Sequence, residues 1–151
     1  EVPDHLSKQK TSYLLISHGD TKNNKRLNNT ELSEKGFEQA AFWGNYFSDK
    51  KIDLFYTSTE TFAFQTIIPI VHPYKGQVRN LDKEFKFDQE FWSKTYGKKS
   101  LIVSSDQQST NFVNEVLQYE KYKGKDIKDE NYLIRVNIDK KHHIKDTLIK
   151  F

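Results

Sequence analysis

Three short polar tripeptides each follow an apolar run, and they hold the side chains best placed to do chemistry. They are Ser17-His18-Gly19, Thr57-Ser58-Thr59 and Ser104-Ser105-Asp106. His18 is the leading candidate, because an imidazole at the end of a strand can act as a nucleophile or as a ligand. The alternative is a structural histidine that hydrogen bonds hold in place. Since the carboxyl ends of strands in an open α/β sheet border one crevice, we expect the three tripeptides to lie together.

Other reactive or metal-binding side chains are scarce. The chain has no cysteine, which excludes disulfides, thiolate metal sites and cysteine nucleophiles. His142 and His143 are adjacent. Neighbouring residues on a strand point to opposite faces, so we expect two surface histidines there and not a shared metal site. We therefore expect neither a metal nor another cofactor.

The order of apolar segments predicts an α/β fold with helices on both faces of a sheet. Short apolar runs predict buried strands at 12–17, 52–56 and 101–103. Ser33 is a good N-cap for a helix that continues to about residue 47. The remaining expected elements are a helix capped by Thr59 or Thr61 and disrupted by Pro69 and Pro73, a short strand at 78–81, a helix at 88–96 ended by Gly97, a helix at 107–119, a charged loop at 121–130, and an antiparallel pair at 132–138 and 143–151.

Size and composition suit one soluble domain. The 151 residues are enough for a single core, so we expect an N-terminal arm at 1–11 and one domain at 12–151. Aromatic residues make up 14% of the chain against 35% for all hydrophobic residues, which predicts an aromatic-rich core. Rings at 85, 87, 91 and 92 belong partly to that core, and some of them could instead mark a contact surface.

Charge and hydropathy exclude two classes of partner. The 24 basic and 21 acidic residues form a mixed surface, without the clustered basic stripe typical of nucleic-acid-binding proteins. The apolar runs, such as residues 13–16, are too short to span a bilayer. The chain starts at Glu1 and contains no methionine, as signal-peptide cleavage or trimming would leave it. We favour an exported or periplasmic location over a cytoplasmic one.

Several motifs, in order, resemble those of the histidine phosphatase (phosphoglycerate mutase-like) superfamily. Residues 15–21, Leu-Ile-Ser-His-Gly-Asp-Thr, resemble the family's opening Arg-His-Gly-Glu-Thr. Residues 32–36, Leu-Ser-Glu-Lys-Gly, resemble its Leu-Thr-Glu-Lys-Gly, and residues 62–66, Phe-Ala-Phe-Gln-Thr, match its Arg-Ala-x-Gln-Thr. Residues 101–105 stand where the family has a strand ending in Gly-His or Ser-His. The resemblance covers about residues 12–138. It is strongest to short members of the phosphohistidine phosphatase type and implies a mostly parallel sheet sandwiched between helices.

The resemblance also implies a mechanism and shows which parts of it are missing. In the family a histidine attacks a phosphoryl group, while two arginines and a second histidine neutralise the phosphoryl oxygens. The nucleophile position holds His18. The two arginine positions hold Ser17 and Phe62, the second histidine position holds Ser105, and a lesser family position keeps Asn24. The resemblance therefore implies a degenerate phosphate pocket around a vestigial nucleophile.

These losses favour a protein that binds but does not catalyse. The pocket has lost two full positive charges and gains Asp20 and Asp106 nearby, so we expect it to be neutral or negative and to repel a phosphate dianion. Loss of one preorganised donor typically costs about 10²–10³ in rate. We expect a pseudophosphatase that binds an unknown protein partner or an uncharged small ligand.

Two other readings stay open. In the first, the chain is an active phosphatase or phosphotransferase that hydrolyses phosphoric monoesters through a phosphohistidine at His18. Lys22, Lys25 or Arg26, on the loop after His18, would then supply the missing charge. In the second, the domain is a scaffold without a small-molecule site.

Overall fold

The computed structural model describes residues 10–81, 85–122 and 131–151. Nearly all of the expected N-terminal arm, and most of the expected charged loop at 121–130, lie outside the described residues. The strands are β1 (Thr11–Ser17), β2 (Leu54–Thr57), β3 (Val78–Asn80), β4 (Lys99–Ser104), β5 (Tyr132–Ile138) and β6 (Ile144–Lys150). The helices are α2 (Glu34–Phe47), α3 (Thr61–Val71), α4 (Gln89–Thr95) and α5 (Asp106–Leu117), with short 3₁₀ turns η1 (Lys22–Asn24) and η2 (His72–Tyr74).

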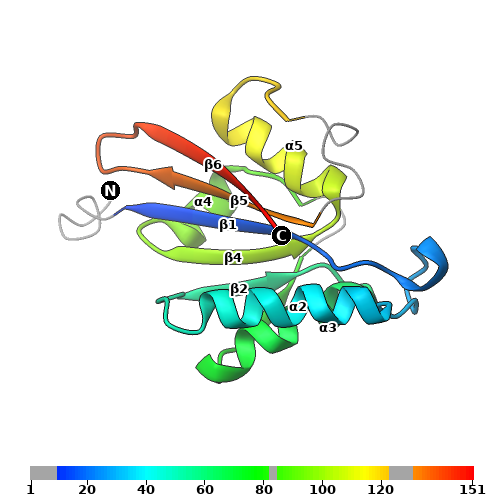
Figure 1. The fold of residues 1–151 in the computed structure, drawn as a ribbon. Coiled ribbons are helices and arrows are strands. Elements are labelled where there is room, and N and C mark those ends of the chain that lie inside the picture. The colour runs from blue at the N-terminus through cyan, green and yellow to red at the C-terminus, as the bar shows by residue number, and fades with distance from the viewer. Residues whose placement is uncertain (1–9, 82–84, 123–130) are drawn as a thin grey trace.

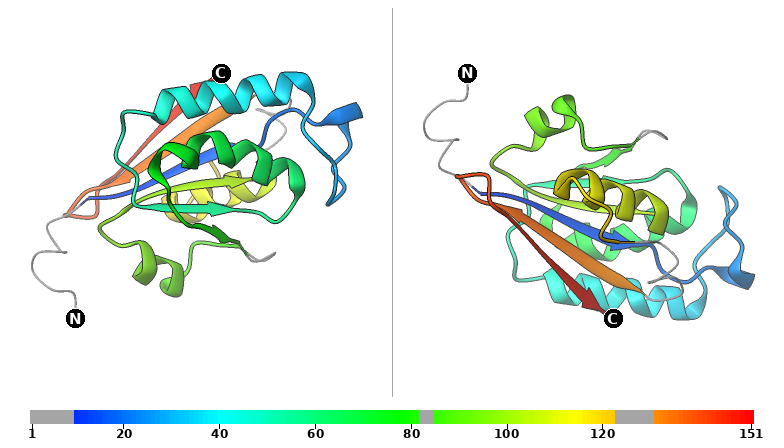
Figure 2. Two further views of the ribbon diagram at one scale, coloured as in Figure 1. Left: turned by 90° about the horizontal axis from the view of Figure 1, so that it is seen from below. Right: turned by 90° about the horizontal axis from the view of Figure 1, so that it is seen from above.

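The strands form one sheet in the order β3-β2-β4-β1-β5-β6 (Figure 1). The first four strands in that order are parallel, and β5 and β6 are antiparallel to their neighbours. Helices cover both faces, with α2 and α3 on one side and α4 and α5 on the other (Figure 2). The predicted α/β class, with a mostly parallel sheet between helical layers, is confirmed. No helix in the described ranges has the length and apolarity needed to cross a membrane.

Most buried hydrophobic residues in the described chain are aliphatic, so the expected aromatic-rich core is confirmed only for the largest side chains. The largest fully buried side chains include Trp43, Tyr13, Tyr132, Phe47 and Phe112. Each face of the sheet therefore gains much of its apolar burial from a few large rings.

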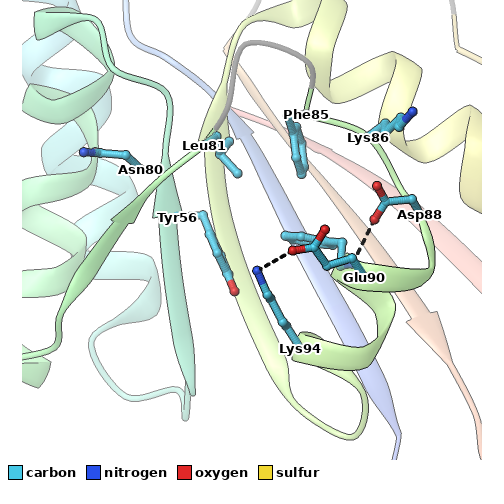
Figure 3. A pocket seen from close by; sticks show the side chains of 9 residues that line it. Tyr56, Asn80, Leu81, Phe85, Lys86, Asp88, Glu90 and Lys94 are labelled. Carbon is cyan, nitrogen blue, oxygen red and sulfur yellow. Dashed lines mark hydrogen bonds and ion pairs between the residues drawn. The ribbon is translucent and has the colours of Figure 1, made fainter.

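The aromatic cluster at 85–92 completes the core on the α5 side of the sheet. Phe85 and Phe91 contact the buried ring of Phe112, with centroids 4.9 and 5.6 Å away. Phe85 and Phe91 also line a small pocket of about 140 Å³, together with Tyr56 (Figure 3). The four rings at 85, 87, 91 and 92 are all partly buried against this core, so packing accounts for them.

Pro69 does not disrupt helix α3, contrary to the prediction. The helix continues through Pro69 to Val71, and its N-cap is Glu60, not either predicted threonine. Proline removes one helical hydrogen bond, but tertiary packing can outweigh local propensity. Here the backbone of Pro69 packs closely on α2, because a Cβ atom added to Gly44 would lie only 2.8 Å from the Pro69 carbonyl oxygen.

Two glycines allow the segment after β1 to pack closely against the first turn of α2. A Cβ atom on Gly36 would lie 2.1 Å from the carbonyl oxygen of Asp20, and one on Gly19 would lie 2.7 Å from the carbonyl oxygen of Gly36. Ser33 caps α2 by accepting from the Gly36 amide at 3.1 Å, and its hydroxyl donates to the Asp20 carboxylate at 2.6 Å. The segment that follows His18 is therefore fixed directly against the first turn of α2.

Candidate active-site crevice

The predicted strand exits lie side by side. Ser17 pairs with Ser104 and Thr57 pairs with Val103, so β1, β4 and β2 end at the same edge of the sheet. A crevice of about 320 Å³ opens at this edge. It is lined by His18, Gly19, Asp20, Asn24, Arg26, Lys35, Gln39, Asp106 and Asn131. The tripeptide at 57–59 lies at the end of the neighbouring strand β2 but contributes no lining residue.

The hydrogen bonds of His18 define its tautomer. Its Nδ1 atom lies 2.9 Å from the carbonyl oxygen of Gly19, and its Nε2 atom lies 3.0 Å from Nη1 of Arg26. A carbonyl oxygen only accepts and a guanidinium only donates, so Nδ1 carries the proton and Nε2 carries the lone pair. His18 is therefore a neutral imidazole whose lone pair faces the crevice and accepts from Arg26.

The surroundings of His18 favour its neutral form. Burial lowers the pKa of His18, whose residue is only 7% exposed, and the positive charge of Arg26 lowers it further. The Gly19 carbonyl and the carboxylates of Asp106 and Glu60 act in the opposite direction without reversing the shift. A neutral imidazole with an oriented lone pair is the form that a nucleophile or a hydrogen-bond acceptor requires.

Replacing Arg26 with Gln is expected to raise the pKa of His18, because the positive charge of Arg26 is one of the two causes that lower it. An NMR titration of the His18 ring protons measures this directly. Lys22→Gln is the matched control, because Lys22 is an exposed cation of the same loop that pairs with Glu31 and not with His18. An unchanged His18 pKa in Arg26→Gln, or an equal change in the control, would contradict the contact.

The same shift makes folding sensitive to acid. Because the folded-state pKa of His18 is below its ordinary value of 6.5, the unfolded chain binds more protons once the pH falls below 6.5. The contribution of His18 to stability is therefore lost as the pH falls from 6.5 towards the folded-state pKa. His18→Gln should remove this part of the pH dependence in urea unfolding.

Ser17, at the first lost arginine position, has a structural role. Its hydroxyl oxygen accepts from the backbone amide of Tyr132 at 3.2 Å and from the side-chain amide of Asn131 at 3.3 Å. The Asn131 amide also reaches the carbonyl oxygens of Ser17 and His18, at 3.1 and 3.4 Å, and its own oxygen accepts from the indole of Trp43. Ser17 thus ties β1 to the start of β5. Asn131 is a site residue that the sequence motifs missed.

Phe62 and Ser105 also have structural roles. The Phe62 ring is 3% exposed and lies 4.4 Å from the His18 ring, so it packs against the imidazole from the first turn of α3. Ser105 is the N-cap of α5, where it accepts from the Gln108 amide at 3.2 Å within a capping box. Asn24 lines the crevice from η1 with a positive φ of 56°. Of these positions, only His18 and Asn24 border the crevice directly.

The lining charges of the crevice balance. Arg26 and Lys35 are cationic, and Asp20 and Asp106 are anionic. The Asp106 carboxylate accepts from the hydroxyl of Tyr132 at 3.2 Å. Of the three loop cations that the sequence offered as replacements, Arg26 lines the crevice, and the balanced charges agree with the neutral alternative for the pocket. Lys35 belongs to the Leu-Ser-Glu-Lys-Gly segment, for which the family resemblance implied no role in the pocket.

The adjacent histidines at 142 and 143 lie at the surface, as expected. His142 and His143 are both exposed, and His143 lies 3.3 Å from Asp139 across the turn that joins β5 to β6. Among the described residues, no group of histidine and acidic side chains is arranged to hold a metal ion.

Comparison with known proteins supports the assignment of the fold. Residues 13–87 match the model of the histidine phosphatase superfamily, branch 1. No protein of curated function matches the chain in sequence.

Solved structures extend the similarity over almost the whole chain. Phosphoserine phosphatase from Entamoeba histolytica, crystallised with 3-phosphoglyceric acid, is 15% identical with a TM-score of 0.75, covering 93% of this chain and 97% of its own. Phosphoglycerate mutase from Bacillus anthracis is 12% identical with a TM-score of 0.72, covering 96% and 95%. The protein histidine phosphatase SixA, solved with tungstate, is 13% identical with a TM-score of 0.70, covering 92% and 96%.

At these identities the structural matches show a shared fold and not a shared activity. The family match begins in β1, runs through the His18 loop, α2 and α3, and so includes the residues that build one side of the crevice. The chain belongs to the histidine phosphatase superfamily.

Proposed function

We propose that this protein is a catalytically inactive member of the histidine phosphatase superfamily that acts by binding a protein partner or an uncharged small ligand at the crevice. One observation carries the proposal. Arg26 donates to Nε2 of His18 at 3.0 Å, so it occupies the lone pair that would have to attack a phosphorus atom. An imidazole whose lone pair is already engaged is a poor nucleophile.

The replaced positions support the same conclusion. Ser17 accepts from Tyr132 and Asn131, Phe62 packs on the His18 ring, and Ser105 caps α5. None of these side chains can neutralise the equatorial oxygens of a transferring phosphoryl group, which is the main contribution of a protein to this reaction.

The balanced charges of the crevice favour an uncharged polar occupant. A phosphate dianion near Arg26 would also meet the carboxylates of Asp20 and Asp106. A ligand or loop that donates and accepts hydrogen bonds can use the lining amides of Asn24 and Gln39 without that repulsion.

Turnover of a generic aryl phosphate tests the proposal. We expect the intact protein and His18→Ala to hydrolyse the substrate at the same background rate, because the reaction does not pass through His18. A rate that is clearly above background in the intact protein and absent in His18→Ala would show that the protein is an enzyme.

The position of Arg26 also supports a second candidate, an active phosphatase with a relocated arginine. Arg26 is the cation closest to the nucleophile position, and the ring of His18 is neutral and oriented. A phosphate ester that drew the guanidinium onto its own oxygens would free the Nε2 lone pair to attack phosphorus. The P–O bond to the alcohol would break as the leaving oxygen takes a proton from water, and a second water would then cleave the P–N bond and release phosphate. In that case both His18→Ala and Arg26→Gln would abolish turnover, whereas Lys22→Gln would not.

A further inference from the structure

A second pocket, of about 360 Å³, lies at the opposite end of the sheet from His18. It borders the beginning of β1, whereas His18 follows the end of that strand, so the two sites are separated by about 20 Å of extended chain. Figure 2 shows the start of β1 and the loop after it at opposite ends of the molecule. The pocket is lined by Lys10, Ser12, Lys51, Asp53, Gly97, Lys98, Lys99, Arg135 and Asn137.

Positive charge is concentrated at this pocket. Five lining residues are Lys or Arg and one is acidic, whereas the whole chain has 24 basic and 21 acidic residues. The single carboxylate, Asp53, accepts from the backbone amide of Lys99 at 2.9 Å. Within the described part of the chain, none of the five cations forms an ion pair. Such a group of cations repel one another and attract an anion.

An unpaired donor on Arg135 independently indicates that the pocket binds an anion. It lies on β5, and its Nε atom is buried without a hydrogen-bond partner in the described structure. A buried donor that is left unpaired costs free energy, and nearly all such groups in folded proteins have a partner. A guanidinium can donate two parallel hydrogen bonds to one phosphate group. An anion that enters the pocket beside Arg135 would supply the acceptors.

Hydrogen bonds between the segments that line the pocket hold it in shape. Ser12 donates from its amide to the Lys98 carbonyl oxygen at 3.0 Å and from its hydroxyl to Asn137 at 2.7 Å. The Asp53 amide donates to the Lys99 carbonyl oxygen at 2.9 Å. Four separate segments are thereby fixed around one cavity. Because they are already ordered, little conformational entropy is lost when a ligand binds.

The lining also narrows the class of ligand. It contains no aromatic or large aliphatic side chain on which a nucleobase could stack or a lipid chain could pack. The cations come from four segments of the chain, which suits an anion with its charge spread over more than one group. We propose that this pocket binds a small, wholly polar ligand that carries two or more phosphate groups.

Isothermal titration with inorganic triphosphate at about 50 mM salt tests the site, since attraction between exposed charges is largely screened at higher salt. We expect saturable binding of one triphosphate per chain, weakened about tenfold or more by Arg135→Gln through loss of a charge-assisted contact. Lys98→Gln/Lys99→Gln should weaken it comparably, and it remains a valid test if Arg135→Gln does not fold.

Two controls decide where the anion binds. Lys140→Gln/Lys141→Gln removes the same charge from an exposed turn, and Arg26→Gln removes a cation from the His18 crevice. Both should leave the affinity for triphosphate unchanged. The proposal is overturned if triphosphate does not bind saturably, if the turn variant weakens binding as much as the pocket variants, or if only Arg26→Gln weakens it. Tight binding of DNA or of a polyglutamate peptide without binding of triphosphate would also overturn it. These outcomes do not depend on whether the His18 crevice is catalytic.

Discussion

Phe62→Arg, which restores the residue of the family motif, is expected to destabilise the protein by about 3–5 kcal/mol without creating a phosphatase. The Phe62 ring is 3% exposed and packs on His18, so the substitution removes a buried ring and introduces a cation in its place. The new guanidinium would also lie near Arg26, which already donates to His18. Urea unfolding of the two proteins at one pH measures the difference.

Phe64→Arg is the matched control for this change. Phe64 lies on the same helix but is 49% exposed, so the same substitution there should alter the free energy of unfolding by no more than about 0.5 kcal/mol. If Phe62→Arg were as stable as Phe64→Arg, the site of Phe62 would still accommodate an arginine, and the view that packing has replaced the phosphate pocket would be wrong.

Gly36→Ala is expected to cost about 3 kcal/mol or more. A Cβ atom at this position would lie 2.1 Å from the carbonyl oxygen of Asp20, which is backbone and cannot rotate away. The clash would separate α2 from the segment after His18, whose Gly19 carbonyl orients the imidazole. Both the midpoint of urea unfolding and the NMR signals of the His18 ring should therefore change.

Glu38→Ala controls for the introduction of alanine into this helix. Glu38 is exposed on α2, and alanine is the best helix former, so little change in stability is expected there. A Gly36→Ala protein that matched Glu38→Ala in stability would show that the contact between α2 and the His18 segment is looser than the structure indicates.

Local sequence signals predicted most of the fold. The alternating apolar residues at 132–138 gave strand β5 with the boundaries that the structure has, and Ser33 is the N-cap of α2 as expected. Predictions failed where tertiary contacts outweighed local preference. Pro69 stays inside α3 because the helix packs closely on Gly44 of α2, and no local pattern records that contact.

Only part of the candidate site could be predicted from the sequence. Family motifs pointed to His18, and the strand order brought it beside Ser105. The capping role of Ser105 could also have been read from the spacing of Ser105 and Gln108, which is the signature of a capping box. The sequence named Arg26 only as one of three loop cations that could lie near His18. It could not select Arg26, because the choice depends on the path of a loop that includes the left-handed residues Asn23 and Asn24.

Phosphoryl transfer to His18 is the most direct test of the claim that this site is inactive. The intact protein and His18→Ala would be incubated with phosphoramidate, a donor of phosphoryl groups to histidine, and examined by intact mass spectrometry at neutral pH. Because Arg26 engages the Nε2 lone pair and no arginine stands at positions 17 and 62, we predict that the intact protein gains no phosphoryl group beyond those that exposed histidines also acquire in His18→Ala. An acid-labile phosphoryl adduct on the intact protein that is missing from His18→Ala would contradict the account and establish His18 as a working nucleophile.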